Sequence, residues 1–193
     1  INSKKHFILE KIENYCIFGL GASRNEKRFD IKKFVEIAKN EIFLNNKNLK
    51  IILLGSNSEI ELGKLFLNFY GDDDNKKIIN LIGKTSILDI FSIIKYSKFV
   101  LGNDSAYIHI ATALNIPSIC LLSGHNYGSF LPYQIDENEN SRTIPTCITS
   151  TKMDCFGCGV ICKFGLTKNK KYVCVENIDI KKIIDGIKNL NLE

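Results

Sequence analysis

Short apolar runs alternate with segments of helical periodicity between residues 15 and 122, and this alternation limits the possible folds more than any other feature. The apolar runs have the length of buried strands, and they cover residues 15–20, 50–55, 78–82, 99–101 and 117–122. Strands that alternate with helices form a parallel sheet with right-handed crossovers, and apolar strands without polar alternation suit a sheet that is covered on both faces. The sequence therefore predicts an α/β fold: a Rossmann-like parallel sheet of about five strands, with helices on both faces.

The segments between the runs place their apolar residues at helical spacing. Phe34, Val35 and Ala38 follow the first run in this way, and Leu62 and Phe66 follow the second. A short polar residue directly before such a segment is a typical helix cap, and we expect Ser86 to cap the helix that follows residues 78–82.

Size and charge exclude several classes of protein. A chain of 193 residues with 45% hydrophobic residues is large enough for one domain with a full core. The net charge of +5 comes from scattered lysines, so nucleic acid is not an expected partner, although a weakly basic face suits an acidic membrane surface or an anionic acceptor. No apolar run reaches about 18 residues and no signal peptide is recognisable, which predicts a soluble protein. Because the chain begins with Ile1 rather than Met, we expect it to be a piece of a longer protein.

Composition divides the chain into four expected regions. Residues 1–14 are a linker or interdomain helix, and residues 15–125 form the Rossmann-like core. Residues 126–176 are rich in glycine, asparagine and cysteine and form a loop region, and residues 177–193 form a C-terminal helix. A loop of this length in a compact domain usually has a function or is ordered by something else.

Two loops are expected to face one ligand crevice. In open parallel sheets, ligands bind beyond the carboxyl ends of the strands where the strand order reverses. Residues 19–28 follow the first strand and residues 102–105 follow the fourth, and these strands are neighbours in a doubly wound sheet. The first loop lacks the dinucleotide fingerprint, and no Walker A sequence occurs. It offers Ser23, Arg24, Lys27 and Arg28, hydroxyl and cationic groups that suit a diphosphate; the alternative is a solvated, charged loop.

The stretch from Val100 to Leu114 reads as a buried strand, a tight turn at Gly102-Asn103 and a helix opened by short polar residues. Such residues cap the free N–H groups of a helix, and those groups also attract anions. A capped helix with no ligand is the alternative. His109 stands four residues after Ser105 and thus on the same helix face, either as a packed residue or as a ligand contact.

Residues 102–109, GNDSAYIH, resemble the G-[NV]-D-[ST]-G-x-x-H signature of glycosyltransferase family 9, the heptosyltransferase family. Further segments resemble the family in the same order. GASRNEKRF, residues 21–29, resembles the family's donor-phosphate loop. LLGSNSE, residues 53–59, and LIGKTS, residues 81–86, resemble the two segments that line the nucleoside. NIPS, residues 115–118, resembles the turn after the signature helix. The resemblance covers about residues 15–125, and several ordered motifs together are more specific than any one of them.

The resemblance implies the C-terminal, donor-binding half of a GT-B enzyme, in which two Rossmann-like domains face each other. It implies inverting transfer, typically from ADP-L-glycero-D-manno-heptose, onto a glycan or lipid-linked acceptor in lipopolysaccharide core synthesis, without a cofactor. The family's general base is an aspartate of the N-terminal half, which has no counterpart in this chain. It further implies a cytoplasmic protein, peripheral at the inner membrane of a Gram-negative bacterium.

The resemblance also assigns residues. Ser23 and Lys27 are expected to contact the diphosphate, and Lys27 to offset the charge that develops on the leaving nucleotide. Glu59 and Thr85 are expected near the ribose and base. The full set of expected donor-binding residues is Ala22, Ser23, Lys27, Glu59, Thr85, Asp104, Ser105, Ala106, Tyr107 and His109.

One position departs from the signature: Ala106 stands where the family has glycine, and bulky Tyr107 follows it. Because glycine lets the backbone approach a ligand closely, this change is expected to narrow or reshape the pocket. This departure raises two alternatives: the donor is a nucleotide sugar other than ADP-heptose, or the chain is a binding module that has lost catalysis.

Five of the seven cysteines fall late in the chain. Cys155, Cys158, Cys162 and Cys174 have a spacing that allows a structural zinc site, which would make the region a zinc-stabilised interaction domain. Reduced thiols or disulfides are the alternatives. Cys16 and Cys120 lie in predicted strands and are expected to be buried packing residues.

Overall fold

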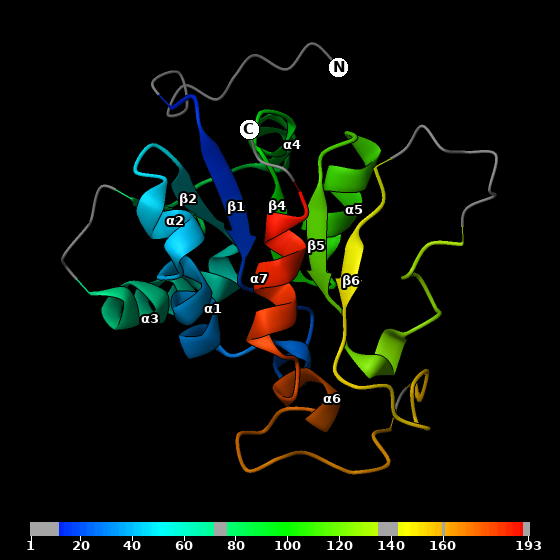
Figure 1. Ribbon diagram of the computed structural model, residues 1–193. Helices are drawn as coiled ribbons and strands as arrows, with labels where there is room; N and C mark the ends of the chain where they lie inside the picture. The colour runs from blue at the N-terminus through cyan, green and yellow to red at the C-terminus, as the bar shows by residue number, and fades with distance from the viewer. Residues whose placement is uncertain (1–11, 72–76, 135–142, 160, 191–193) are drawn as a thin grey trace.

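In a computed structural model the chain forms one six-stranded sheet in which every pairing is parallel (Figure 1). The structure describes residues 12–71, 77–134, 143–159 and 161–190. The strand order is β3-β2-β1-β4-β5-β6. The strands are β1 Tyr15–Gly19, β2 Lys50–Leu54, β3 Ile78–Asn80, β4 Val100–Asn103, β5 Ser118–Leu121 and β6 Thr146–Ile148. The predicted Rossmann-like fold is confirmed.

The sheet has one strand more than the expected five. β6 spans only three residues within the region expected to be a loop, and it pairs with β5 through the Cys120–Cys147 register. A three-residue strand is too short to produce a detectable sequence period, so only its partner strand reveals it.

The helices begin where short polar residues stand before an apolar stripe. Asp30 and Asp179 accept hydrogen bonds from the backbone N–H two residues ahead. Ser86 caps its helix as predicted and forms a capping box with Asp89. The α-helices are α1 Ile31–Ala38, α2 Glu41–Asn45, α3 Ile60–Tyr70, α4 Ile87–Lys95, α5 Ala106–Ala113, α6 Val173–Glu176 and α7 Ile180–Lys188.

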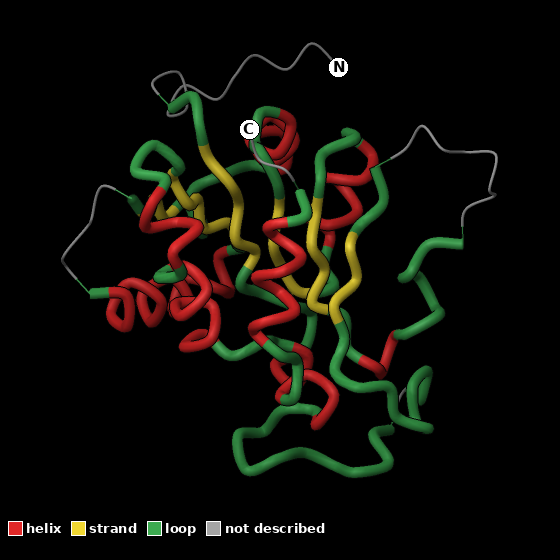
Figure 2. Tube along the Cα trace, viewed as in Figure 1, coloured by secondary structure: helices red, strands yellow, loops and turns green. Residues whose placement is uncertain are grey.

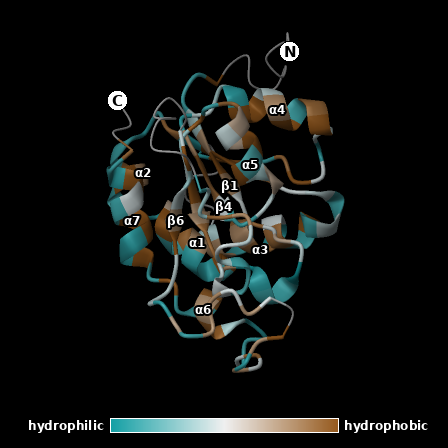
Figure 3. Cartoon of the chain, turned by 90° about the vertical axis from the view of Figure 1, so that its right-hand side faces the viewer, coloured by the Kyte–Doolittle hydropathy of each residue, from teal (hydrophilic) through white to brown (hydrophobic). Residues whose placement is uncertain are grey.

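Each face of the sheet is covered by its own layer of helices. Phe18 points into the core beneath α1, α2, α3 and α7, where it packs against the rings of Phe34, Phe43 and Phe66. Ile17 points the other way, into the core beneath α4 and α5. Figure 3 shows the hydrophobic strands β1 and β4 between these layers. Burial on both faces explains why the strands are apolar throughout.

β1 and β4 are adjacent at the centre of the sheet, and Gly19 lies opposite Gly102 in their register. From β1 the chain adds β2 and β3 on one side, and from β4 it adds β5 and β6 on the other, so the strand order reverses between β1 and β4. The loops that leave their carboxyl ends therefore start side by side, at the lower edge in Figure 2.

The turn expected at Gly102-Asn103 is wrong, because both residues belong to β4. A Cβ atom at Gly102 would lie 3.1 Å from the Gly19 carbonyl oxygen, so the glycine serves close strand contact rather than a turn. None of the helices within the described residues is both long enough and apolar enough to cross a membrane. Residues 1–11, most of the predicted linker, lie outside the described residues.

Candidate functional site

A pocket of about 320 Å³ opens at the switch point between β1 and β4. Its walls come from the loop after β1, the loop after β2 and the start of α5, segments that are far apart in the sequence. It contains seven of the ten expected donor-binding residues. The lining residues are Gly21, Ala22, Ser23, Arg28, Ser56, Ser58, Glu59, Asp104, Ser105, Ala106 and Tyr107.

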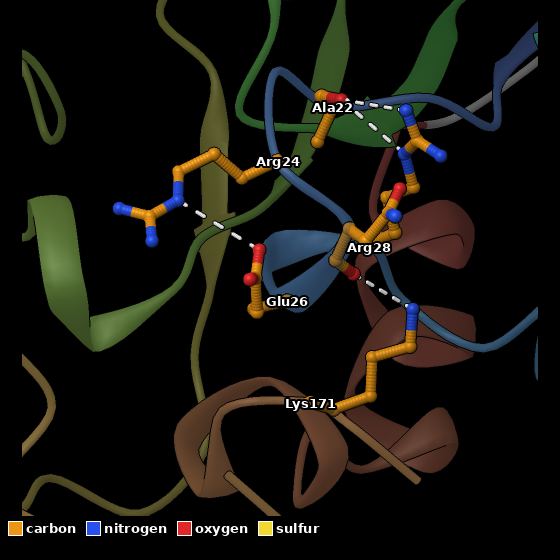
Figure 4. A network of polar contacts seen from close by, with 6 residues as sticks. Ala22, Arg24, Glu26, Arg28 and Lys171 are labelled. Carbon is orange, nitrogen blue, oxygen red and sulfur yellow. Dashed lines mark hydrogen bonds and ion pairs between the residues drawn. The ribbon is translucent and has the colours of Figure 1, made fainter. Parts of the chain in front are cut away.

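The loop after β1 is tied to β4 by the side chain of Asn103, which is 1% exposed. Its Oδ1 accepts a hydrogen bond from the Phe29 N–H at 2.8 Å, and its Nδ2 donates to the carbonyl oxygens of Leu20 at 3.0 Å and Gly21 at 3.1 Å. Arg28 closes the same loop with two hydrogen bonds of 3.2 Å to the Ala22 carbonyl oxygen (Figure 4). Asn103 thus sets the shape of the segment that carries Ser23.

Glu59 forms the opposite wall. Its carboxylate accepts hydrogen bonds from the Ser56 N–H at 2.7 Å and the Ser56 hydroxyl at 3.0 Å, a capping box at the short 3₁₀ helix Asn57–Glu59 (η3). The carboxylate also lies against the backbone at Gly21, where a Cβ atom would come 1.4 Å from Oε1. A side chain at Gly21 would therefore have to displace the hydrogen-bonded Glu59 carboxylate, which explains the glycine at this position.

Tyr107 occupies the floor between these walls. A Cβ atom at Gly19 would lie 3.0 Å from the Tyr107 ring, so the ring lies directly over the end of β1. Burial, and then the negative charge of Glu59, raise the pKa of Tyr107 to about 12. The ring thus fills space beside the Glu59 carboxylate.

The start of α5 is not capped as expected. Ser105 is the N-cap residue, but its side chain makes no capping hydrogen bond, and its Oγ is buried without a partner among the described residues. Among the described residues, the Ser105 hydroxyl thus accepts no hydrogen bond from the free N–H groups of the first turn. The N-terminal N–H groups of α5 are therefore available to an anion in the pocket.

Asp104 is held from two sides, by the segment that follows β5 and by α5. Asn126 Nδ2 donates to Oδ2 at 3.0 Å, and His109 Nε2 lies 3.7 Å from Oδ1. The other ring nitrogen of His109 is hydrogen bonded to the Tyr133 hydroxyl. His109 therefore supports Asp104 and does not line the pocket. Asn126 and Tyr133 were missed, because the region that contains them has no sequence period.

Lys27 and Thr85 also lie outside the pocket lining. Lys27 ends the 3₁₀ helix Asn25–Lys27 (η2), within the electrostatic reach of His125. Thr85 follows β3, and its hydroxyl is buried without a partner among the described residues. The structure thus places Thr85 at the same edge of the sheet, but beyond the pocket itself.

The expected zinc site is not assembled. Within the described ranges, no three His, Cys, Asp or Glu side chains meet in a way that would hold a metal, and all seven cysteines are free. Cys174 packs in a small apolar cluster with Tyr172 and Val175. Burial raises the pKa of Cys158 and of Cys174, and neighbouring cysteines act in the same direction. Cys16 and Cys120 are buried strand residues, as predicted.

The late segment instead packs against the loop after β1. Lys171 Nζ donates to the Asn25 carbonyl oxygen at 2.8 Å, a contact visible in Figure 4, and the Tyr172 N–H donates to the Glu26 carbonyl oxygen at 3.1 Å. η2, which carries Lys27, is thereby held between the sheet edge and the cysteine-rich region.

The sequence of residues 2–158 matches the family model of glycosyltransferase family 9 (heptosyltransferase). The chain belongs to this family. This member of family 9 is 26% identical over 182 residues to lipooligosaccharide heptosyltransferase 2 of Campylobacter jejuni subsp. jejuni serotype O:6, a match that covers 91% of this chain and 51% of that protein. The chain thus spans about half the length of this curated relative.

Solved structures of family 9 proteins share the fold. ADP-heptose LPS heptosyltransferase II of E. coli superposes with a TM-score of 0.71 at 21% identity, over 95% of this chain and 48% of that one. E. coli heptosyltransferase WaaC with ADP-2-deoxy-2-fluoro heptose gives a TM-score of 0.58 at 16% identity, over 93% and 44% of the two chains. The chain therefore has the fold of the C-terminal half of a GT-B heptosyltransferase.

Proposed function

We propose that the chain is the donor-binding half of an inverting glycosyltransferase that takes a nucleotide sugar of the ADP-heptose type. The observation that carries this proposal is the pocket at the switch point, which joins Ser23, Glu59 and the open start of α5. The structure of E. coli heptosyltransferase WaaC with ADP-2-deoxy-2-fluoro heptose supports the choice of donor.

The donor would lie along the pocket from Glu59 toward Asp104. Glu59 offers carboxylate oxygens to the ribose hydroxyls, while Thr85 stands farther along the sheet edge, on the side of the base. Ser23, the Ser105 hydroxyl and the first N–H groups of α5 suit the phosphates.

The transfer step places its negative charge on this half of the enzyme. An acceptor hydroxyl attacks the anomeric carbon and loses its proton to a base, while the bond from that carbon to the phosphate oxygen breaks and the nucleoside diphosphate leaves. Lys27 and the start of α5 would stabilise the leaving group. Asp104 is assigned a positioning role rather than that of the base, since its carboxylate accepts a hydrogen bond from Asn126 and faces His109.

A second Rossmann-like domain, N-terminal to this one, would supply the base and the acceptor site. We propose a glycan or lipid-linked acceptor of lipopolysaccharide core synthesis, at the cytoplasmic side of the inner membrane. Transfer would need no cofactor, and nucleic acid would not be a partner. The length of the relative from Campylobacter, about twice the matched span, supports a further domain.

Titration calorimetry of the complete protein with ADP, UDP and GDP tests the proposal. We expect one diphosphate, ADP, to bind, and Lys27→Ala to weaken its binding about tenfold, as for loss of a charge-assisted contact. Lys188→Ala removes the same charge from an exposed position of α7 and should leave the affinity unchanged. Absence of binding by all three diphosphates would refute the proposal.

The transfer reaction separates an enzyme from a binding module that has kept the fold. With ADP-heptose and a heptose-deficient acceptor, Lys27→Ala and Asp104→Ala should each lower the rate of transfer. A wild-type protein that binds ADP but transfers no sugar would favour the inactive module.

A further inference from the structure

His125 is a buried, polar residue that the donor-binding motifs do not include. It lies in the 3₁₀ helix Gly124–Asn126 (η5), directly after β5, and is 7% exposed. Its Nδ1 is buried and has no hydrogen-bond partner among the described residues. Buried polar groups in native proteins are almost always paired, so an unpaired imidazole nitrogen at a sheet edge indicates a missing partner.

The position of His125 is next to the proposed phosphate end of the donor. Asn103 and Leu121 are opposite each other in the β4–β5 register, and Ser105 and Ser123 each stand two residues beyond this pair. The Ser123 hydroxyl is buried and unpaired, like that of Ser105. The loops after β4 and β5 thus bring several unpaired hydrogen-bonding groups to one edge of the sheet.

Charged groups face His125 from two elements. Burial lowers the pKa of His125, and the positive charges of Lys27 and Arg24 at η2 lower it further. The carboxylate of Asp104 acts in the opposite direction. Asp104 is itself hydrogen bonded to Asn126, the neighbour of His125. An anion at this place would contact the same cations that surround the imidazole.

The cysteine-rich segment fixes His125 in place. The Gly157 N–H donates to the Gly124 carbonyl oxygen at 2.7 Å, and the Gly159 N–H donates to the His125 carbonyl oxygen at 3.2 Å. The ring of Tyr172 meets the imidazole edge to face, with the centroids 5.3 Å apart. A ring held in this way is pre-organised for a ligand, so little conformational freedom is lost when one binds.

We propose that His125 is a further donor-binding residue, which donates a hydrogen bond to the β-phosphate of the nucleotide sugar beside Lys27. The inference rests on the proposed function, because it takes the direction of the donor from Glu59 toward Asp104. This proposal also assigns a role to the cysteine-rich segment, which holds both η2 and η5 in place on either side of the proposed phosphate position.

Comparison of ADP with AMP tests this contact, because AMP lacks the β-phosphate. In the complete protein, His125→Phe keeps an aromatic ring against Tyr172 but removes both nitrogens. We expect this variant to bind ADP about tenfold or more weakly and to bind AMP within about twofold of the wild type. His125→Gln keeps a hydrogen-bond donor and should recover much of the ADP affinity. Thermal unfolding shows whether each variant is folded, and His125→Leu, which also lacks both ring nitrogens, replaces His125→Phe if that variant does not fold.

The outcomes separate the two proposals. A wild type that binds ADP, together with a His125→Phe variant that loses ADP and AMP affinity equally or loses neither, would overturn the role of His125 alone. A His125→Gln variant that binds ADP as weakly as His125→Phe would do the same. A wild type that binds no nucleoside diphosphate would overturn the proposed function and this inference with it.

Discussion

Asn103→Ala gives the most direct test of how the donor loop is held. The substitution removes three hydrogen bonds, of 2.8, 3.0 and 3.1 Å, and leaves the Phe29 N–H and the carbonyl oxygens of Leu20 and Gly21 without this partner. A neutral hydrogen bond contributes about 1 kcal/mol net, so the free energy of unfolding should fall by roughly 3 kcal/mol. At roughly 2–4 °C per kcal/mol for a domain of this size, the melting temperature should fall by about 6–12 °C.

Urea denaturation of the wild type and the variant measures this difference, with an unchanged m-value as the sign that the same structure unfolds. Asn177→Ala is the matched control: the residue is exposed at the end of α6, and its substitution should change stability by no more than about 0.5 kcal/mol. ADP affinity should fall in Asn103→Ala only, because Ser23 and Lys27 lie on the loosened loop.

Asn103→Asp sharpens the test, since it keeps an acceptor for the Phe29 N–H but turns a carboxylate oxygen toward two carbonyl oxygens. At neutral pH we expect it to be at least as destabilised as Asn103→Ala. If Asn103→Ala destabilises the protein no more than Asn177→Ala does, the assignment of Asn103 as the tie between β4 and the loop is wrong.

Three further predictions concern the site and its scaffold. Ser86→Ala should lower the free energy of unfolding by about 1 kcal/mol in urea, because it breaks the capping box with Asp89, and no loss would contradict that geometry. Gly21→Ala should destabilise the protein and abolish ADP binding in calorimetry, because the alanine Cβ would meet Glu59 Oε1. The double variant with Glu59→Ala should recover stability, and a double variant that does not would refute the clash. Tyr107 has a pKa raised to about 12, so its unfolded form ionises first near its ordinary value of about 10 and stability should fall as pH rises between the two. Tyr107→Phe should lose that part of the alkaline decline in pH-dependent unfolding, and an identical decline would speak against the buried phenol.

The sequence predicted the alternating architecture because the signal is local. Strands such as Tyr15–Gly19 are apolar throughout because both faces are covered, and helices such as α4 show their cap at Ser86 directly in the chain. The order of the motifs also indicated the family, since each loop follows its own strand. Seven donor-site residues predicted in this way lie together around one pocket.

Other predictions failed where the deciding contact is remote in sequence. Gly102 and Asn103 have turn-forming residue types, but pairing with β1 and β5 makes them strand. The side-chain partners of Asn103 lie 74 to 83 residues away. Cysteine spacing suggested a metal site, yet spacing does not fix the direction in which a thiol points. β6 was missed because its three residues gain order only from β5.

The sequence by itself determined the Rossmann-like sheet, the family and most of the pocket wall, because periodicity, caps and ordered motifs are properties of neighbouring residues. Only the tertiary structure decided which polar groups are satisfied. It showed that Asp104 is engaged by Asn126 and His109, that Ser105 leaves α5 uncapped, and that His125 is buried with an unpaired nitrogen. Burial and hydrogen bonding depend on segments that meet only when the chain has folded, and these determine what the site can bind.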